Sequence, residues 1–388
     1  MIILDGLGIG ELPDACIYGD EGSNTLGNLA RTVARLSLPH LEAFGLGNLG
    51  DFQGIKPRSS PGAVIGRLAE ASPGKDTTTG HWELMGLPLD SPFPTYPQGF
   101  PPEVIEPFQK AIGRKVLGNF PASGTDIIAR LGKEHLRTGC PIVYTSADSV
   151  FQVATHEEVI PLQELYQICF KARELLTGNH AVARVIARPF RGRPGSFYRT
   201  GNRRDFSLVP PKETLLDRLS TVGIPVIGIG KIGDLFAGQG ISLSIPAKSN
   251  KEVTDGVLDQ MSLLDRGLIF ANLVDFDTLY GHRNDPQGFA AALEEFDRRL
   301  PEIKGLMRPE DVLFITSDHG CDPTTPSTDH SREYVPLLVY GARVEPGRDL
   351  GIRKSFADVG QTMGEIFGVG PLQAGISFWD VIKKGNHP

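Results

Sequence analysis

The chain has 388 residues, of which 40% are hydrophobic and 22% are charged, as is ordinary for a folded globular protein. This length exceeds one typical domain, so two domains are expected. The net charge of −7 argues against a general nucleic-acid binder and against a protein of membrane surfaces.

The cysteines and the apolar runs exclude further classes of protein. The four cysteines are scattered and form no CxxC pair, so we expect neither a disulfide framework nor a zinc ribbon. No apolar run approaches the roughly 20 residues of a membrane span, and the first residues lack a signal-peptide layout. A protein of the reducing cytoplasm is therefore expected.

The chain begins with a very short predicted strand, residues 1–4, that ends at Asp5 before a glycine-rich turn. Ligands of open α/β sheets gather at the carboxyl ends of strands, so Asp5 is a candidate metal ligand. An ordinary turn residue is an equally good interpretation of Asp5. The glycines of residues 6–10 lack the GxGxxG spacing of dinucleotide binding. Residues 24–36 show the period of an amphipathic helix that covers the sheet.

Residues 74–83, Gly-Lys-Asp-Thr-Thr-Thr-Gly-His-Trp-Glu, place three hydroxyls between a charged pair and a glycine. A hydroxyl beside a cation can lose its proton at neutral pH and become a nucleophile. The spacing does not choose among Thr77, Thr78 and Thr79. A threonine N-cap of a helix that runs through Leu84 is the structural alternative, and the two interpretations are compatible.

A proline-rich stretch marks a crossing between domains. Residues 88–107 contain seven prolines, which predicts neither helix nor central strand. Pro210-Pro211 marks the return crossing. The sequence thus predicts a core domain made of residues 1–92 and 210–388, with a smaller α+β cap at 93–209 whose helices and strands are expected at 123–131, 142–145, 162–175 and 181–187.

The cap segment also carries a dense group of basic residues. Seven arginines fall within 21 residues: Arg184, Arg188, Arg191, Arg193, Arg199, Arg203 and Arg204. Guanidinium groups match phosphate oxygens bidentately, so we predict a phosphate clamp formed by one to three of them, the rest being surface charge. Asp148 follows the strand expected at 142–145.

Two further strands are expected in the second part of the core. A strand is expected at residues 226–229, and Lys231 follows its end. A solvated lysine and a ligand-binding lysine are equally good interpretations of this position. Residues 268–274 lead to Asp277 and His282, whose spacing is poor for one helix face, so we expect a turn at Gly281. A helix at 289–300 follows.

The stretch from residue 311 to residue 330 organises the predicted site. Residues 312–315 form an apolar run typical of a strand buried on both faces, and Asp318-His319-Gly320 follows it. We expect Gly320 to permit the turn by which Asp318 and His319 converge. Together with His330 they suit a divalent metal, although a loop of satisfied polar groups is the alternative for any one of them. A strand at 335–339 and a helix at 355–366 close the chain.

The candidate site residues share positions at strand ends or in glycine-punctuated loops. They are Asp5, Thr77, Asp277, His282, Asp318, His319 and His330. This set is sufficient for two metals that share a bridging group, which can stabilise the attacking and leaving oxygens of a phosphoryl displacement.

Over essentially its whole length the sequence resembles the phosphopentomutases of the alkaline phosphatase superfamily. The motifs that carry the resemblance lie at residues 8–11, 13–14, 74–77, 80–83, 144–150, 185–190, 272–277, 328–330 and 332–334. The resemblance implies an α/β fold, with an alkaline-phosphatase-like core around a mostly parallel sheet and an inserted α+β cap. It also implies a cytoplasmic isomerase of nucleoside catabolism that interconverts ribose 1-phosphate and ribose 5-phosphate, and the deoxyribose pair.

The resemblance further implies roles for individual residues. Thr77 would be the phosphorylated nucleophile. Two manganese ions would be held, one by Asp5, Asp318 and His319, and the other by Asp277, His282 and His330. The substrate would be bound by Asp148, Arg184, Arg199 and Lys231. A sugar bisphosphate such as glucose 1,6-bisphosphate would be the activator, and no nucleic acid, membrane or obligate protein partner is implied.

Three features depart from the family pattern. The chain begins four residues before Asp5, where the family has a longer strand, so the start is either truncated or unusually short. Gly6 replaces a common serine, and Cys321 stands where asparagine is common; no departure removes a ligand.

Two alternative functions remain. One is a metal-dependent phosphatase or phosphoglycerate mutase of the same superfamily. The other is a non-enzymatic metal-binding protein, which would leave the hydroxyl loop and the arginine cluster without a purpose.

Overall fold

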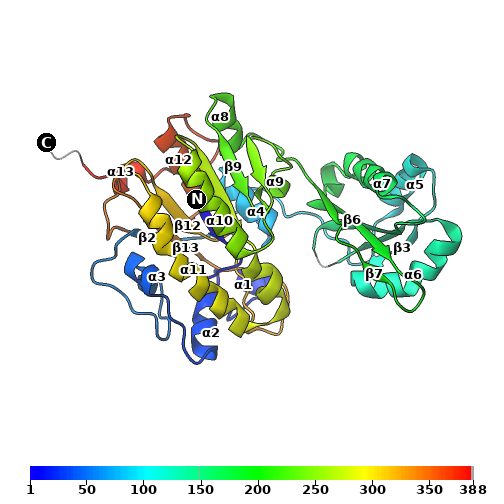
Figure 1. The fold of residues 1–388 in the computed structure, drawn as a ribbon, viewed down its shortest axis with the longest axis horizontal. Helices are drawn as coiled ribbons and strands as arrows, with labels where there is room; N and C mark the ends of the chain where they lie inside the picture. The colour runs from blue at the N-terminus through cyan, green and yellow to red at the C-terminus, as the bar shows by residue number, and fades with distance from the viewer. Residues whose placement is uncertain (147, 386–388) are drawn as a thin grey trace. The chain divides into compact units, whose positions relative to one another are not determined.

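The computed structural model describes residues 1–146 and 148–385, so Ala147 of the 144–150 motif lies outside the described residues. The chain forms two compact units, coloured by residue number in Figure 1. Unit 1 consists of Met1–Pro92 with Pro210–Pro388, and unit 2 of Phe93–Val209.

Unit 1 is built on an eight-stranded sheet with the order β10-β9-β11-β1-β12-β13-β2-β14. Neighbouring strands are parallel except that β13 runs antiparallel to β12 and to β2, which confirms the mostly parallel sheet. The strands are β1 (Ile2–Leu4), β2 (Val64–Leu68), β9 (Val226–Ile229), β10 (Leu243–Ile245), β11 (Leu268–Leu273), β12 (Leu313–Thr316), β13 (Val335–Tyr340) and β14 (Asp349–Arg353).

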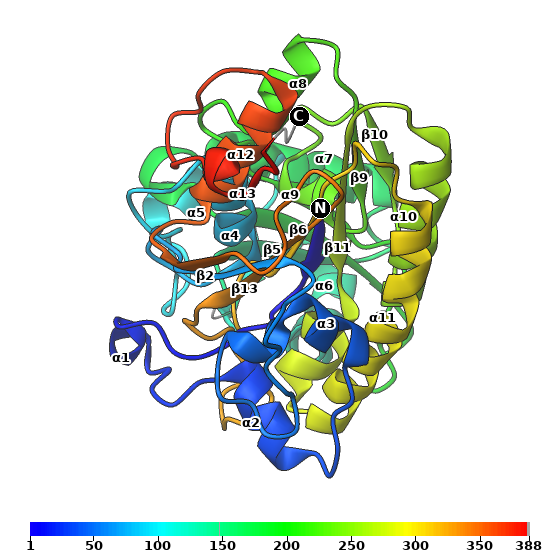
Figure 2. The same ribbon diagram turned by 90° about the vertical axis from the view of Figure 1, so that its left-hand side faces the viewer.

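Helices cover both faces of this sheet, with α10 and α11 on one face and α4 and α12 on the other (Figures 1 and 2). Burial on both faces explains why the central strands are continuous apolar runs. Ile2 and Leu4 of β1, for example, belong to the same apolar core as Val253 of α10 and Phe289 of α11. The α-helices are α1 (Ala15–Tyr18), α2 (Thr25–Thr32), α3 (Pro39–Phe44), α4 (Thr77–Leu84), α8 (Leu215–Thr221), α9 (Ile232–Leu235), α10 (Asn250–Leu263), α11 (Pro286–Leu306), α12 (Ala357–Phe367) and α13 (Trp379–Ile382).

Unit 2 is a mixed sheet with helices on both faces. Its strands follow the order β3-β4-β5-β6-β7, and β8 also pairs with β6. Val185 and Ala187 of β6 pack into one apolar core, and Phe190 of the same strand packs into the other. The elements are α5 (Pro102–Ile112), β3 (Leu117–Pro121), α6 (Gly124–Thr138), β4 (Ile142–Thr145), β5 (Val150–His156), α7 (Leu162–Leu175), β6 (Arg184–Arg191), β7 (Tyr198–Arg199) and β8 (Arg204–Ser207).

Most expected elements are confirmed, although the bounds of several differ from the expectation; α6, for example, runs to Thr138 rather than to residue 131. α5 begins at Pro102 inside the proline-rich stretch, so the exclusion of helix there was wrong; proline is well tolerated at the first helical position. The strand expected at 181–187 begins only at Arg184. The helix expected at 24–36 ends at Thr32, because Val33 adopts an extended conformation while its side chain remains buried.

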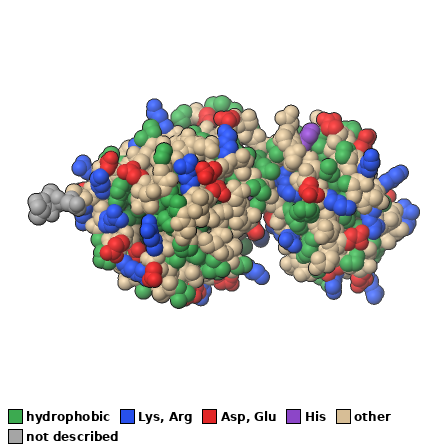
Figure 3. All heavy atoms as spheres, turned by 90° about the horizontal axis from the view of Figure 1, so that it is seen from above, with side chains coloured by type: hydrophobic (Ala, Val, Ile, Leu, Met, Phe, Trp, Pro, Cys, Tyr) green, Lys and Arg blue, Asp and Glu red, His purple; other side chains and the backbone are tan. Residues whose placement is uncertain are grey.

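The molecular surface carries charges of both signs. Acidic and basic side chains are interspersed over both units on the face drawn in Figure 3. Among the described residues, no helix combines the length and the apolar character needed to span a membrane.

Candidate metal centre

The predicted aspartates follow three strands that are neighbours in the sheet. Asp5 comes directly after β1, while Asp277 follows β11 and Asp318 follows β12, and β1 is hydrogen-bonded to both of these strands in parallel. Parallel strands bring their carboxyl ends to one edge of the sheet. All three carboxylates are at most 2% exposed, so the fold gathers three buried acidic groups at one place.

The first ligand group consists of Asp5, Asp318 and His319, which can hold one ion between them. His319 Nε2 lies 3.4 Å from Asp5 Oδ1 and 3.2 Å from Asp318 Oδ2. Gly6 stabilises this arrangement, because its φ of +82° lies in the region that favours glycine and its backbone N–H donates to Asp318 Oδ1 at 3.2 Å.

The second group surrounds Asp277. His282 Nε2 and His330 Nε2 each lie 3.2 Å from Asp277 Oδ1, and they lie 3.2 Å from each other. The His319 and His330 rings stack with centroids 3.8 Å apart, and Asp277, His319 and His330 also lie close enough to hold an ion. The two groups are therefore contiguous, as a pair of metals with a shared bridging group requires.

Backbone carbonyl groups orient the three imidazoles. The Nδ1 atoms of His282, His319 and His330 lie 2.7, 3.0 and 2.8 Å from the carbonyl oxygens of Thr328, Gly320 and Lys75. A carbonyl can only accept, so each Nδ1 carries a proton and donates it. Each Nε2 then faces the carboxylates, the orientation that second-shell partners impose on metal-binding histidines.

The structure distinguishes the three threonines by their contacts. Thr77 Oγ1 lies 3.0 Å from His319 Nε2. The Thr79 hydroxyl instead donates to Asp76, and Asp76 also accepts the Thr79 backbone N–H, so Asp76 is the N-cap of α4. The threonine N-cap interpretation was therefore wrong, and Thr77 is the first residue of the helix.

Lys231 lies at the centre itself. Its Nζ is 3.1 Å from Asp5 Oδ2 and 3.6 Å from Asp277 Oδ2, so one ammonium group contacts the carboxylates of both ligand groups. Sequence reasoning identified Lys231 at a strand end but expected a contact with substrate rather than with these aspartates.

The neighbours of the buried carboxylates determine their protonation. Burial alone would raise the pKa of Asp318, but the adjacent His319 and His81 imidazoles hold that pKa well below its ordinary value. Burial opposes ionisation of Asp277 in the same way, and His330 with Lys231 lowers the Asp277 pKa well below the usual range. Asp277 and Asp318 are therefore carboxylates, not neutral acids.

Unsatisfied oxygens show that the centre fits divalent cations. Among the described residues, Asp5 Oδ1, Asp277 Oδ1 and Asp318 Oδ2 are buried and make no hydrogen bond. A buried charged oxygen without a partner is costly unless it binds a cation. Carboxylate and imidazole ligands together suit manganese and similar divalent metals.

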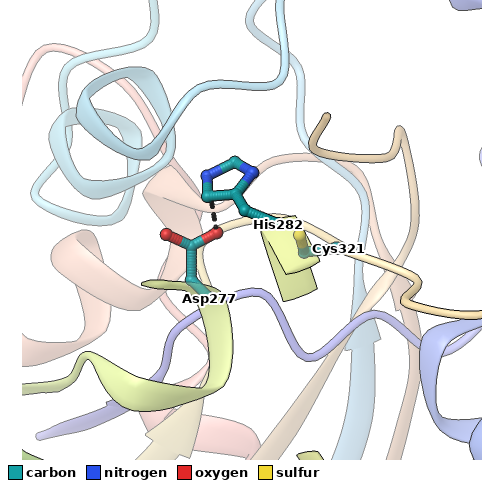
Figure 4. A group of neighbouring side chains, drawn as sticks. All are labelled: Asp277, His282 and Cys321. Atoms are coloured by element: carbon teal, nitrogen blue, oxygen red, sulfur yellow. Dashed lines mark ion pairs between the residues drawn. The ribbon is translucent and has the colours of Figure 1, made fainter. Parts of the chain in front are cut away.

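Cys321 joins this neighbourhood and was missed as a candidate. Its sulfur and ligand atoms of Asp277 and His282 lie within 4.8 Å of one another (Figure 4). Burial raises the pKa of the Cys321 thiol well above its ordinary value, so the thiol is neutral here. The only sequence signal was its place directly after the His-Gly pair.

Two glycines act through close packing rather than through a special backbone conformation. Gly281 has a helical φ of −57°, and a Cβ there would lie 2.5 Å from Cys321 Sγ. Asp277 and His282 are brought together by a π-helical turn, Phe276–Tyr280, followed by a 3₁₀ turn. Gly320 also lacks a positive φ, and a Cβ there would lie 2.5 Å from Glu333 Oε1. The expected turn at Gly281 is therefore present, as the 3₁₀ turn that begins there, whereas the backbone freedom expected of Gly320 is not used.

The remaining candidates lie in unit 2. Arg184 opens β6, with its guanidinium 3.8 Å from Asp205. Arg199 is exposed in β7 and packs against Gly124 at the start of α6. Asp148 is exposed between β4 and β5.

A buried arginine that was not a candidate supports the loop before Thr77. Arg332 Nη1 donates to Glu70 Oε2 at 2.7 Å and to the carbonyl groups of Ser72 and Gly74 at 2.8 and 2.7 Å. Because Arg332 is two residues from His330, it ties the hydroxyl loop to a candidate metal ligand. Its place in the 332–334 motif was the available signal.

Comparison with known proteins identifies the family and the fold of this chain. The family model described as the metalloenzyme superfamily matches residues 1–371. A phosphopentomutase of Dictyoglomus turgidum is 60% identical, covering 99% of this chain and 98% of that protein. A phosphopentomutase of Caldanaerobacter subterraneus subsp. tengcongensis is 58% identical, covering 97% and 96%. The PH0037 protein of Pyrococcus horikoshii, a solved structure 16% identical, has the same fold with a TM-score of 0.50 over 97% of this chain and 98% of its own.

Proposed function

This chain belongs to the phosphopentomutase family of the metalloenzyme superfamily, and we propose that it interconverts ribose 1-phosphate and ribose 5-phosphate, and the deoxyribose pair, through phosphorylated Thr77. The observation that carries the proposal is the Thr77 hydroxyl, 3.0 Å from His319 Nε2 beside three buried carboxylates. A hydroxyl in such a place is set up as a nucleophile for phosphate.

We propose that the centre holds two manganese ions. Asp5, Asp318 and His319 would hold one, and Asp277, His282 and His330 the other; the three unsatisfied carboxylate oxygens support this assignment. Bound cations would neutralise charge that develops on the attacking and leaving oxygens. The Nδ1 bonds to backbone carbonyl groups turn the three Nε2 atoms toward the carboxylates, which is the orientation that a metal-binding histidine needs.

The chain's own chemistry is a pair of phosphoryl transfers. The Oγ–P bond of phosphorylated Thr77 breaks as an O–P bond forms to the free hydroxyl of the sugar monophosphate, and the proton of that hydroxyl passes, in balance, to the released Thr77 Oγ1. The resulting bisphosphate returns its other phosphate to Thr77, so the enzyme is regenerated in phosphorylated form. A sugar bisphosphate such as glucose 1,6-bisphosphate would supply the first phosphate by the same reaction.

Residues of unit 2 are proposed to hold the sugar. Arg184 and Arg199 would bind the phosphate that is not being transferred, and Asp148 the sugar hydroxyls, with Lys231 also contacting substrate. Planar guanidinium groups suit a phosphate monoester. The cytoplasm is the proposed location, since the four cysteines are free, as in a reducing compartment.

The wild-type enzyme provides the direct test. After priming with a sugar bisphosphate, ribose 1-phosphate should be converted to ribose 5-phosphate with little inorganic phosphate released, as followed by phosphorus NMR. Radioactive phosphate from the bisphosphate should remain on the chain. Release of inorganic phosphate as fast as sugar phosphate is consumed would contradict a mutase and indicate a phosphatase.

Charge reversal in unit 2 tests substrate binding. We expect Arg199→Glu to raise KM roughly 10- to 100-fold, the worth of a lost charge-assisted hydrogen bond, and to increase the share of phosphate lost to water. Arg193→Glu, at another exposed arginine of the same cluster, is the matched control and should leave both quantities near wild type. Equal defects in the two variants would indicate a general charge effect instead of a specific contact.

A further inference from the structure

The motif at residues 80–83 is conspicuous in the sequence, yet none of its residues is among the proposed ligands. Gly80 lies against the strand-end loop of β12, where any side chain would overlap the carbonyl oxygen of Asp318. Trp82 Nε1 donates to the Leu235 carbonyl at 2.9 Å. The buried Glu83 carboxylate accepts the backbone N–H of Ser72 at 2.7 Å and that of Phe356 at 2.9 Å. Gly80 thus allows α4 to lie directly against Asp318, and the bonds of Trp82 and Glu83 hold the helix to other segments of unit 1.

His81, the remaining member of the motif, is fully buried between the nucleophile and a candidate metal ligand. Its Nδ1 lies 2.9 Å from the Thr77 carbonyl oxygen and 3.2 Å from Asp318 Oδ2. A carbonyl and a carboxylate are acceptors only, so Nδ1 carries a proton in this position. On the other side of the ring, Asn272 Nδ2 lies 3.2 Å from Nε2.

We propose that His81 is a positioning residue, which orients Asp318 toward the metal and holds Thr77 in its place beside Asp318. Asp318 Oδ2 makes no hydrogen bond of good geometry among the described residues, and it is the oxygen that faces both His81 Nδ1 and His319 Nε2. The Nδ1 proton is donated to the Thr77 carbonyl and so holds the first turn of α4, while the positive end of the same N–H group lies 3.2 Å from Asp318 Oδ2 and attracts this oxygen to its present direction. The inference rests on the proposed function, in which Asp318 is a ligand.

A purely structural role is the competing explanation, since the His81 ring also packs near Phe270, with centroids 5.7 Å apart. The two explanations differ in what the side chain must provide. Packing needs a ring of about this size, whereas positioning needs a donor where Nδ1 lies. His81→Phe keeps the ring without the donor, and His81→Asn keeps an amide donor near the Nδ1 position without the ring. His81→Gln places its amide farther out, nearer to the position of Nε2.

Metal affinity separates the two explanations without any substrate. Manganese binding to the purified, metal-free variants would be measured by equilibrium dialysis with electron paramagnetic resonance of the free ion. We expect His81→Phe and His81→Gln to lose about 10- to 100-fold in affinity at one of the two sites, as for loss of a second-shell partner. His81→Asn should stay within a few-fold of wild type. His135→Asn, at a buried histidine of unit 2, is the control and should bind both ions normally.

Each result decides the matter. Wild-type affinity in His81→Phe or in His81→Gln overturns the proposal, as does a defect in His81→Asn equal to that of the other two. If His81→Phe does not fold, as judged by its thermal unfolding in EDTA, then His81→Gln and His81→Asn still give opposite expectations. A wild-type enzyme that hydrolyses sugar phosphates would overturn the proposed function and leave this pattern of affinities intact.

Discussion

Thr77→Val should abolish both sugar phosphate interconversion and labelling of the chain by a radioactive bisphosphate. Valine keeps the branched shape of threonine and removes only the hydroxyl, so the start of α4 should remain folded. Loss of a covalent nucleophile costs roughly four orders of magnitude or more in kcat. The physical basis is that, in the described part of the chain, Thr77 Oγ1 is the hydroxyl of the three that contacts a candidate metal ligand, at 3.0 Å from His319 Nε2.

Thr78→Val is the matched control for this prediction. Thr78 is the next residue of the same helix and is buried, whereas Thr77 is half-buried, so the two substitutions place the same side chain in adjacent positions. We expect the control to retain labelling and at least a large part of the activity. Labelling of Thr77→Val at the wild-type level, located by mass spectrometry on another residue, would show that Thr77 is not the acceptor.

Local patterns predicted many of the elements of both units. The strands at 142–145 and 226–229 and the helix at 162–175 lie where their apolar patterns placed them, because both faces of each sheet are covered. The placement of Asp5, Asp277 and Asp318 at strand ends was visible in the same way. Their convergence depends on β1 lying between β11 and β12, a sheet order that no local pattern contains.

Contacts made in three dimensions explain what the sequence did not predict. The proximity of Lys231 to Asp5, and of Cys321 to Asp277, joins segments that are far apart in the chain. Gly281 was interpreted through backbone freedom, yet the reason for a glycine there is the sulfur that a Cβ would meet. A neighbour of this kind is known only once the chain is folded.

The same convergence makes Asp318 the proposed ligand at which we expect a substitution to have the largest effect. Its carboxylate accepts the Gly6 N–H through Oδ1 and faces His319 and His81 through Oδ2, so it joins β12, the loop after β1 and α4. Asn would preserve the shape and remove the charge. Loss of a charged oxygen weakens a divalent site, because a neutral amide attracts the cation less.

A two-metal site holds about two ions per chain when it is filled. We therefore expect the Asp318→Asn and His330→Ala variants to bind clearly less metal than this. Both should lose at least about 100-fold in activity. Elemental analysis after dialysis measures the metal, and excess manganese should restore part of the activity. Asp311→Asn is the control, because this carboxylate lies at the opposite end of β12 from the ligands and accepts the Arg308 backbone N–H, and the variant should bind metal normally. Full metal occupancy in an inactive Asp318→Asn enzyme would contradict a ligand role and indicate that this carboxylate takes part in proton transfer.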